Sequence, residues 1–203
     1  MALITDITLQ TKNKTRCNLF IDGQFFIALS LETVMLNRLK VGQEVDSEQL
    51  KAIVEENDRK EALVKATDYV CKALKTKRQV RDYLLRKGYS EDVAWYCVDK
   101  LKEYNYINDE EYSKRYIASV SKTQGKRLVE YKLMMKGVKK TDIENAYSDT
   151  EVDSKENAKI IAEKYLRNKE INKENLAKAY RYIISRGFSY DDATYALNQF
   201  DGV

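Results

Sequence analysis

Basic side chains are concentrated in three segments of the chain, and their type and spacing point to binding chemistry. Segments 72–87, 122–140 and 164–186 each carry seven Lys or Arg residues against one or two acidic residues. Like-signed side chains that recur along a chain can form an electropositive track for a polyanion such as nucleic acid. The candidates for this contact are Lys75, Lys77, Arg78, Arg81, Arg86, Lys87, Lys122, Lys126, Arg127, Lys132, Lys136, Arg181 and Arg186.

The same charges have a purely structural interpretation. Basic residues near the C-terminal end of a helix complement the helix dipole, and helical surfaces facing solvent are commonly charged. Recurrence with the same sign in three segments gives binding the same weight as the structural interpretation, so the residues leave both open. No recognition-helix motif stands out, so readout of a specific base sequence is not indicated.

Catalysis has little support in the sequence. The chain contains no histidine, which removes the usual general base at neutral pH and the commonest metal ligand. The three cysteines form no Cys-x-x-Cys pair, and the glycines form no phosphate-binding loop. We therefore expect no enzyme activity, no catalytic residue, no metal site and no cofactor.

Composition also bears on location. No apolar run approaches the roughly 20 residues that span a membrane, and Met1 to Asp6 lacks the build of a secretory signal. Three widely spaced cysteines are typical of a reducing compartment. We expect a cytoplasmic protein with no membrane contact.

Fifteen tyrosines raise the possibility of base stacking. Most of them fall on apolar helical faces, where packing with a hydrogen-bonded hydroxyl is the simpler role. Tyr89, Tyr104 and Tyr106 lie near turns and are the candidates for exposed rings. Trp95 can belong to the core or to the surface.

Residues 1–57 differ from the rest and carry a net charge of −2. Asp22-Gly23 between two apolar, aromatic-rich segments predicts a β-hairpin, within a three-stranded antiparallel sheet or beside a weaker third strand. Ser30 can cap a short helix that Gly42 ends. Ser47 begins another helix, which can continue into the helix that follows.

The remaining residues show an internal repeat. Gly88, Gly137 and Gly187 are 49 and 50 residues apart, and apolar residues recur at the same offsets from each glycine. Each glycine can end the middle helix of a triplet, because glycine enters the left-handed C-cap geometry without a steric cost. Stacked repeats of this kind form arrays. We predict an extension at 1–57 and three-helix repeats at 58–107, 108–153 and 154–203.

Cap residues place the helix starts within these repeats. Thr76 with Gln79, and Asn108 with Glu111, have the spacing of a capping box. Thr141 with Glu144 has the same spacing before the last helix of the second repeat. The fold class predicted is mainly α, with three tandem three-helix repeats in an elongated curved array after a small β-hairpin extension.

Three segments resemble the RecX family of regulatory proteins. They are YLLRKGY, ending at Tyr89, LKEYNYINDEEY, ending at Tyr112, and KGV, starting at Lys136. The resemblance covers residues from about 58 to 203, and the hairpin extension is similar to that of the longer members. This chain departs from the family pattern at Asn105, Asn108 and Ser113, where the family has glycine, aspartate and alanine. Asparagine tolerates left-handed geometry and caps helices, so the fold is not in doubt.

The resemblance implies a partner and an activity. Members of the family lie in the groove of the RecA recombinase filament on single-stranded DNA. They hinder its extension or promote its disassembly, and so lower ATP hydrolysis, strand exchange and the coprotease activity that triggers the SOS response. The basic segments would then face DNA phosphates or an acidic filament surface. We expect a monomer, since a chain that occupies a groove need not self-associate.

Two other functions remain open. One is a general DNA-binding helical protein without a RecA partner, which would bind naked single strands with a steep salt dependence. The other is a protein–protein scaffold that does not contact nucleic acid.

Overall fold

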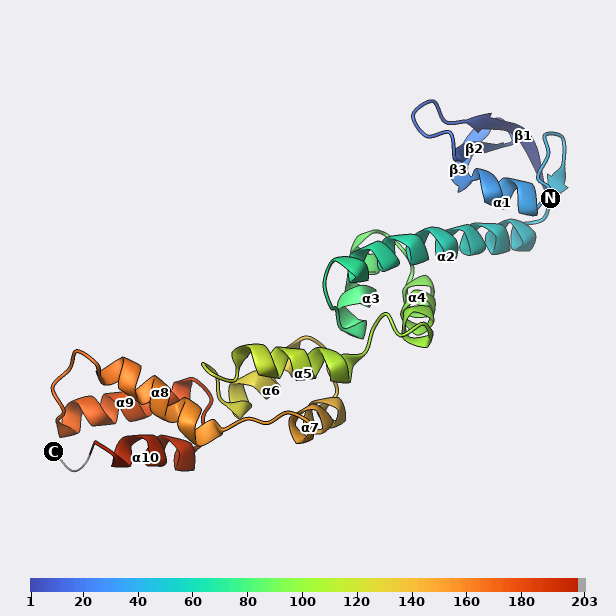
Figure 1. The fold of residues 1–203 in the computed structure, drawn as a ribbon. Helices are drawn as coiled ribbons and strands as arrows, with labels where there is room; N and C mark the ends of the chain where they lie inside the picture. Colours follow the sequence, from blue (N-terminus) through green and yellow to red (C-terminus); the bar gives the residue numbers. More distant parts are fainter. Residues whose placement is uncertain (201–203) are drawn as a thin grey trace. The chain divides into compact units, whose positions relative to one another are not determined.

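The computed structural model describes residues 1–200 and divides the chain into two compact units. One unit contains residues 1–71 and 81–101, and the other contains residues 72–80 and those from 102 onward. Along residues 1–200, strands β1 to β4 and helix α1 come first, and helices α2 to α10 follow them (Figure 1). The predicted fold class, a mainly helical chain of three tandem three-helix repeats after a β-hairpin extension, is confirmed.

The sheet of the first unit is antiparallel and has four strands in the order β3-β2-β1-β4. The strands are β1 (Ala2–Leu9), β2 (Arg16–Ile21), β3 (Gln24–Ser30) and β4 (Glu44–Val45). The β2-β3 hairpin turns at Asp22 and Gly23, which both have positive φ, so the hairpin prediction is confirmed. The prediction of three strands missed β4, because two residues are too short to show an alternating pattern.

Helix α1 (Leu31–Leu36) follows β3 directly. Ser30 caps it as predicted, since its hydroxyl accepts a hydrogen bond from the backbone N–H of Thr33. The helix ends well before Gly42, because Arg38 turns into the left-handed region with φ of 50°.

Helix α2 (Ser47–Lys72) is 26 residues long and serves two cores of the first unit. Leu50 and Ile53 pack with the buried residues of the sheet. Further along, Ala62, Ala66 and Val70 are buried on the same helix. The prediction that the helix from Ser47 continues into the first helix of the repeats is confirmed.

The first repeat continues with α3 (Lys77–Arg86) and α4 (Glu91–Glu103). Thr76 and Gln79 form the predicted capping box: the Gln79 side chain accepts from the Thr76 N–H, and the Thr76 hydroxyl accepts from the Gln79 N–H. Gly88 ends α3 with φ of 89°, as predicted. Ser90 then caps α4 through the Val93 N–H at 3.3 Å.

The second repeat comprises α5 (Asp109–Val120), α6 (Lys126–Met135) and α7 (Lys140–Ser148). Asn108 caps α5, but Glu111 pairs with Arg115 and not with the cap, so half of that predicted box is present. The predicted Thr141 cap is wrong: the N-cap of α7 is Lys139, two residues earlier, and its side chain makes no capping hydrogen bond.

The third repeat comprises α8 (Ser154–Leu166), α9 (Lys173–Ser185) and α10 (Tyr190–Asn198). Its core is built from α8, α9 and α10 together, around Ile161, Ile183 and Phe188. Ser189 and Asp192 form a capping box at the start of α10, which the sequence reasoning did not name.

Within the second unit, a middle helix of one repeat contacts the end of the middle helix in the next. We call this contact the repeat joint. The Thr76 hydroxyl, just before α3, donates to the Lys136 carbonyl at the end of α6 at 2.7 Å. The Gly125 N–H, just before α6, donates to the Arg186 carbonyl at the end of α9 at 2.9 Å. The same construction therefore appears twice.

The repeat joint explains why glycine stands at two of the three helix ends. Gly137 and Gly187 both have φ near 85–90°, which L side chains rarely adopt. In addition, a Cβ on Gly137 would lie 2.4 Å from Cβ of Arg78, and one on Gly187 would lie 2.5 Å from the backbone N of Leu128. Each of these glycines thus ends its own helix and lets the middle helix of the preceding repeat approach closely.

Candidate nucleic-acid interface

In each repeat the basic residue directly before the glycine lies over a tyrosine ring. These residues are Lys87, Lys136 and Arg186, which we call the pre-glycine cations. Each is at the C-terminal end of a middle helix, where the glycine cap turns the chain away. A cation over an aromatic face is held by the ring quadrupole, which fixes the position of its charge.

The first repeat has a tyrosine pair below its pre-glycine cation. The rings of Tyr69 on α2 and Tyr83 on α3 stack with centroids 4.2 Å apart and an interplanar angle of 7°. Nζ of Lys87 lies 5.7 Å from the centroid of Tyr83. Both rings are half-buried, whereas the Lys87 side chain is exposed.

The third repeat reproduces this arrangement. Tyr165 on α8 and Tyr182 on α9 stack with centroids 4.7 Å apart. The Arg186 guanidinium lies 4.9 Å from the Tyr182 centroid, and its Nη2 donates to the Tyr182 hydroxyl at 2.7 Å. Lys169 adds a second cation over Tyr165.

The second repeat uses tyrosines of its first helix alone. Tyr112 and Tyr116, one turn apart on α5, lie nearly parallel with centroids 6.3 Å apart. Nζ of Lys136 lies 5.8 Å from the Tyr116 centroid. Every repeat thus holds one cation on a tyrosine pair next to its glycine.

This arrangement suits contact with phosphate more than stacking with bases. In each repeat the cation lies over the ring of one tyrosine of the pair. An ammonium or guanidinium group retains its N–H donors there and can bind phosphate oxygens. Contact of the pre-glycine cations with an anionic backbone stays a prediction.

Several other predicted site residues are engaged inside the protein. The backbone N–H of Lys77 donates to Asp109, and its Nζ lies 3.9 Å from that buried carboxylate. Arg81 pairs with Asp82 and Glu91 and lies over Trp95. These two basic residues serve the protein's own structure.

Two more have partners at the repeat joint or beside it. The Arg78 side chain covers Gly137, and Nζ of Lys132 donates to Gln124 at 2.7 Å. Lys75 is half-buried in the segment between α2 and α3.

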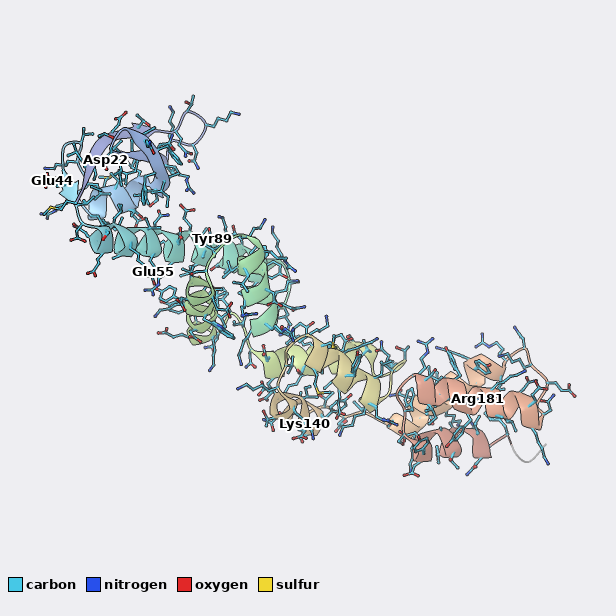
Figure 2. The ribbon with its side chains drawn as sticks, turned by 180° about the vertical axis from the view of Figure 1, so that it is seen from behind. Asp22, Glu44, Glu55, Tyr89, Lys140 and Arg181 are labelled. Atoms are coloured by element: carbon cyan, nitrogen blue, oxygen red, sulfur yellow. The ribbon has the colours of Figure 1, made fainter. Side chains whose placement is uncertain are left out.

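The remaining predicted residues are exposed. Arg181, labelled in Figure 2, lies on α9 and is exposed. Lys126 lies 4.9 Å from the Tyr147 centroid and 3.8 Å from Glu130. The exposed members of the predicted set are Arg78, Arg86, Lys87, Lys122, Lys126, Arg127 and Arg181. Their alignment along one track stays a prediction.

Electrostatics at the repeat joint centre on Asp109, whose side chain is 3% exposed. Burial raises the pKa of this carboxyl above its ordinary value, although the Lys77 N–H and the Lys77 charge oppose the shift. In the first joint, ionisation of Asp109 is thus less favourable than in water. Its carboxylate accepts a hydrogen bond from the Lys77 N–H at the start of α3.

The aromatic candidates divide between surface and partial burial. Tyr104 and Tyr106 are 61% and 48% exposed, as predicted, and Trp95 lies at the surface with 43% exposed. Tyr89 is half-buried instead, because Lys65 lies over its ring and donates to its hydroxyl at 2.6 Å.

The contacts between the pre-glycine cations and tyrosine rings were not predicted from the sequence. Its signal was present in two repeats, since Tyr83 and Tyr182 stand four residues before Lys87 and Arg186 and so share a helical face. In the second repeat the partner Tyr116 comes from another helix, and no local spacing indicates it.

Residues 1–200 contain no group of three or more cysteine, aspartate or glutamate side chains arranged to hold a metal ion. Across the same residues, no helix has both the length and the apolar character to cross a membrane.

Comparison with known proteins places the chain in a family. Residues 2–46 match the family model "Regulatory protein RecX N-terminal domain", and residues 62–101 match "RecX, first three-helix domain". Regulatory protein RecX of Clostridium botulinum (strain Alaska E43 / Type E3) is 36% identical over 200 residues, covering 94% of this chain and 92% of that protein. Its counterpart in Clostridium tetani is 35% identical, covering 97% and 93%.

Solved structures support the same fold. A crystal structure of regulatory protein RecX aligns over 100% of both chains with a TM-score of 0.70 and 23% identity. RecX from Lactobacillus salivarius aligns over 73% of this chain and 99% of its own, with a TM-score of 0.65 and 23% identity. The identity to the clostridial relatives over nearly the whole length decides the assignment: this chain belongs to the RecX family of regulatory proteins.

Proposed function

We propose that this protein is a non-catalytic regulator of the RecA recombinase. It binds in the groove of the RecA filament on single-stranded DNA, in the cytoplasm where that DNA is found. By hindering filament extension it lowers ATP hydrolysis, strand exchange and coprotease activity, and so modulates recombination, DNA repair and the SOS response.

The observation that carries the proposal is the recurrence of one arrangement in three repeats: a pre-glycine cation held on tyrosine. A filament presents the same surface at regular intervals, and a chain with three like contacts gains avidity from individually weak interactions. Family membership supports the choice of RecA, because the relatives carry the name of regulatory protein RecX.

The test replaces Lys87, Lys136 and Arg186 together by Gln and measures the DNA-dependent ATPase of RecA. Wild-type protein is expected to lower the ATPase rate at substoichiometric amounts, and the triple variant is expected to require at least tenfold more protein. If the cations meet phosphates, the salt dependence of binding should weaken, with a log–log slope smaller by about 2 for three lost contacts on single-stranded DNA.

The matched control replaces Lys60, Lys140 and Lys178 by Gln. Each of these pairs with a glutamate one turn away on its own helix. The change in net charge is the same. Equal loss of inhibition in both variants would mean that total charge, and not the pre-glycine cations, determines binding.

The second candidate is a general single-strand binder without a RecA partner. The exposed Tyr104 and Tyr106 favour it, since exposed aromatic rings can stack with bases. Tight binding to naked single strands, with the RecA ATPase rate unchanged, would select this function. If folded protein neither binds naked single strands nor changes the RecA ATPase rate, the remaining function is that of a protein–protein scaffold.

A further inference from the structure

The acceptor half of a repeat joint is also present at the end of α3, and nothing occupies it. At the two occupied joints, the carbonyls of Lys136, Arg186 and Gly187 accept hydrogen bonds from the helix that precedes them in the chain. The corresponding carbonyls of Lys87 and Gly88 accept none from any residue in the described range 1–200.

Gly88 itself has the geometry of the occupied glycines without their neighbours. Its φ is 89°, the same as that of Gly187. A Cβ at Gly137 or Gly187 would meet the adjoining middle helix, whereas one at Gly88 would meet nothing within 4 Å. The end of α3 is exposed at Arg86, Lys87 and Gly88.

The start of α9 has the backbone N–H groups that form the donor half of a joint. Each middle helix begins with a cap residue followed by lysine: Thr76-Lys77, Gly125-Lys126 and Asn172-Lys173. The first two starts are docked on the following repeat. At the third, Asn172 satisfies the Asn175 N–H. The N–H groups of Lys173 and Glu174 have no acceptor among residues 1–200.

We propose that the end of α3 in one copy receives the start of α9 from a second copy, in the manner of the internal repeat joints. The occupant is a second copy because this chain supplies both halves of the contact, one of each. The partial negative charge of a helix C-terminus attracts the partial positive charge of a helix N-terminus. Of the side chains at the start of α9, Glu170 and Glu174 complement Arg86 and Lys87, whereas Lys169 and Lys173 do not, so side-chain charge adds little to this attraction.

Such a contact is heterologous and leaves one half vacant at each end, so copies join in an open row. A single joint buries little surface, and dilute protein therefore stays monomeric. Association follows at high protein concentration, or wherever copies are gathered on a common support.

Engineered disulfides test the joint directly in the free protein. In a Cys71→Ser background, which removes the exposed cysteine, one protein carries Lys87→Cys and another carries Glu174→Cys. Position 174 corresponds to Arg78, whose side chain lies against the glycine of the first joint. Mixed at high concentration and oxidised, the two are expected to form a heterodimer at least tenfold faster than either forms a homodimer.

The matched control moves the second cysteine one turn along α9, to Lys178→Cys. This site is beyond the reach of a disulfide if position 174 adjoins position 87, because bridged Cα atoms lie within about 7 Å. Equal yields for 174 and 178, with helical content unchanged in both, would overturn the proposal. Crosslinking of the Lys87→Cys protein to RecA filaments, and not to the Glu174→Cys protein, would overturn it as well and assign this helix end to the filament.

Discussion

Leu128, in the first turn of α6, lies directly against Gly187, at the end of α9. A Cβ on Gly187 would stand 2.4 Å from the Leu128 Cβ and 2.5 Å from its backbone N. The two residues belong to different repeats, so the space left by one missing side chain determines how closely the repeats approach.

This relationship predicts a graded series of Gly→Ala variants. Gly88→Ala should cost about 1–2 kcal/mol of unfolding free energy, the penalty for a left-handed L residue, because nothing else is in its way. Gly187→Ala should cost more, since the Leu128 backbone must also move. Urea denaturation of the two variants measures the difference. Equal costs would show that close approach contributes nothing to the joint.

Thr76→Val should weaken the first repeat joint. The Thr76 hydroxyl donates to the Lys136 carbonyl and accepts from the Gln79 N–H, and its side chain is buried. Loss of the cap and of the buried donor is expected to cost about 1–3 kcal/mol. Thr76→Ser keeps the hydroxyl and should cost less than half as much. A valine variant as stable as the serine variant in urea denaturation would contradict this role.

Asp192 predicts a stability gain with rising pH. Burial raises the pKa of Asp192, but hydrogen bonds from Ser154 and Ser189 outweigh it and leave the pKa below its ordinary value. Its contribution is therefore present above pH 4 and is lost as pH falls through the lowered folded pKa. Asp192→Asn should cost about 1–2 kcal/mol at pH 6 and progressively less toward pH 2, by chemical denaturation.

Asp109 predicts the opposite sign. Its pKa is raised in the folded protein, mainly by burial, so its contribution is present below its unfolded pKa and is lost as pH rises through the folded value. The stability of Asp109→Asn relative to wild type should therefore improve between pH 3 and pH 6, whereas that of Asp192→Asn should worsen. If the stabilities of Asp109→Asn and Asp192→Asn relative to wild type changed in the same direction with pH, the two pKa shifts would not have opposite signs.

The three cysteines should react at very different rates. Cys71 is exposed, whereas Cys17 and Cys97 are buried. Burial raises the pKa of the Cys97 thiol to about 11, so about one molecule in a thousand carries the thiolate at pH 8. A thiol reagent should modify one cysteine quickly and the other two only on unfolding. Fast modification of two or three in native protein would contradict this packing.

The repeat architecture could be predicted from the sequence because local signals carry it. Gly88, Gly137 and Gly187 mark helix ends through backbone sterics, and the Thr76–Gln79 cap is complete within four residues. Strand β4 could not be predicted, since its two residues form a strand only by pairing with Ala2 and Leu3. The Thr141 cap failed because Thr and Glu at that spacing fit the inside of a first turn equally well.

The candidate site was predictable only in part. The number of charges along the sequence identifies the basic segments, but it does not distinguish basic residues that are paired inside the protein from those that are exposed. Lys77 and Arg81 are bound to Asp109 and Glu91, and these partners lie 32 and 10 residues away in the sequence. Lys136 rests on Tyr116 from another helix. Which lysine is available to a partner depends on such tertiary contacts, and no spacing rule reports them.

Helix α2 is one continuous rod whose two halves are anchored in different cores, at Leu50 and Ile53 in one and at Ala62 and Ala66 in the other. Removing residues 1–57 would also remove the first part of α2, so the part that remains would begin at a new, exposed end. The amino-terminal sheet and the first repeat thus share one helix. A deletion at residue 57 that is made to test the function of the sheet would also disturb the first repeat.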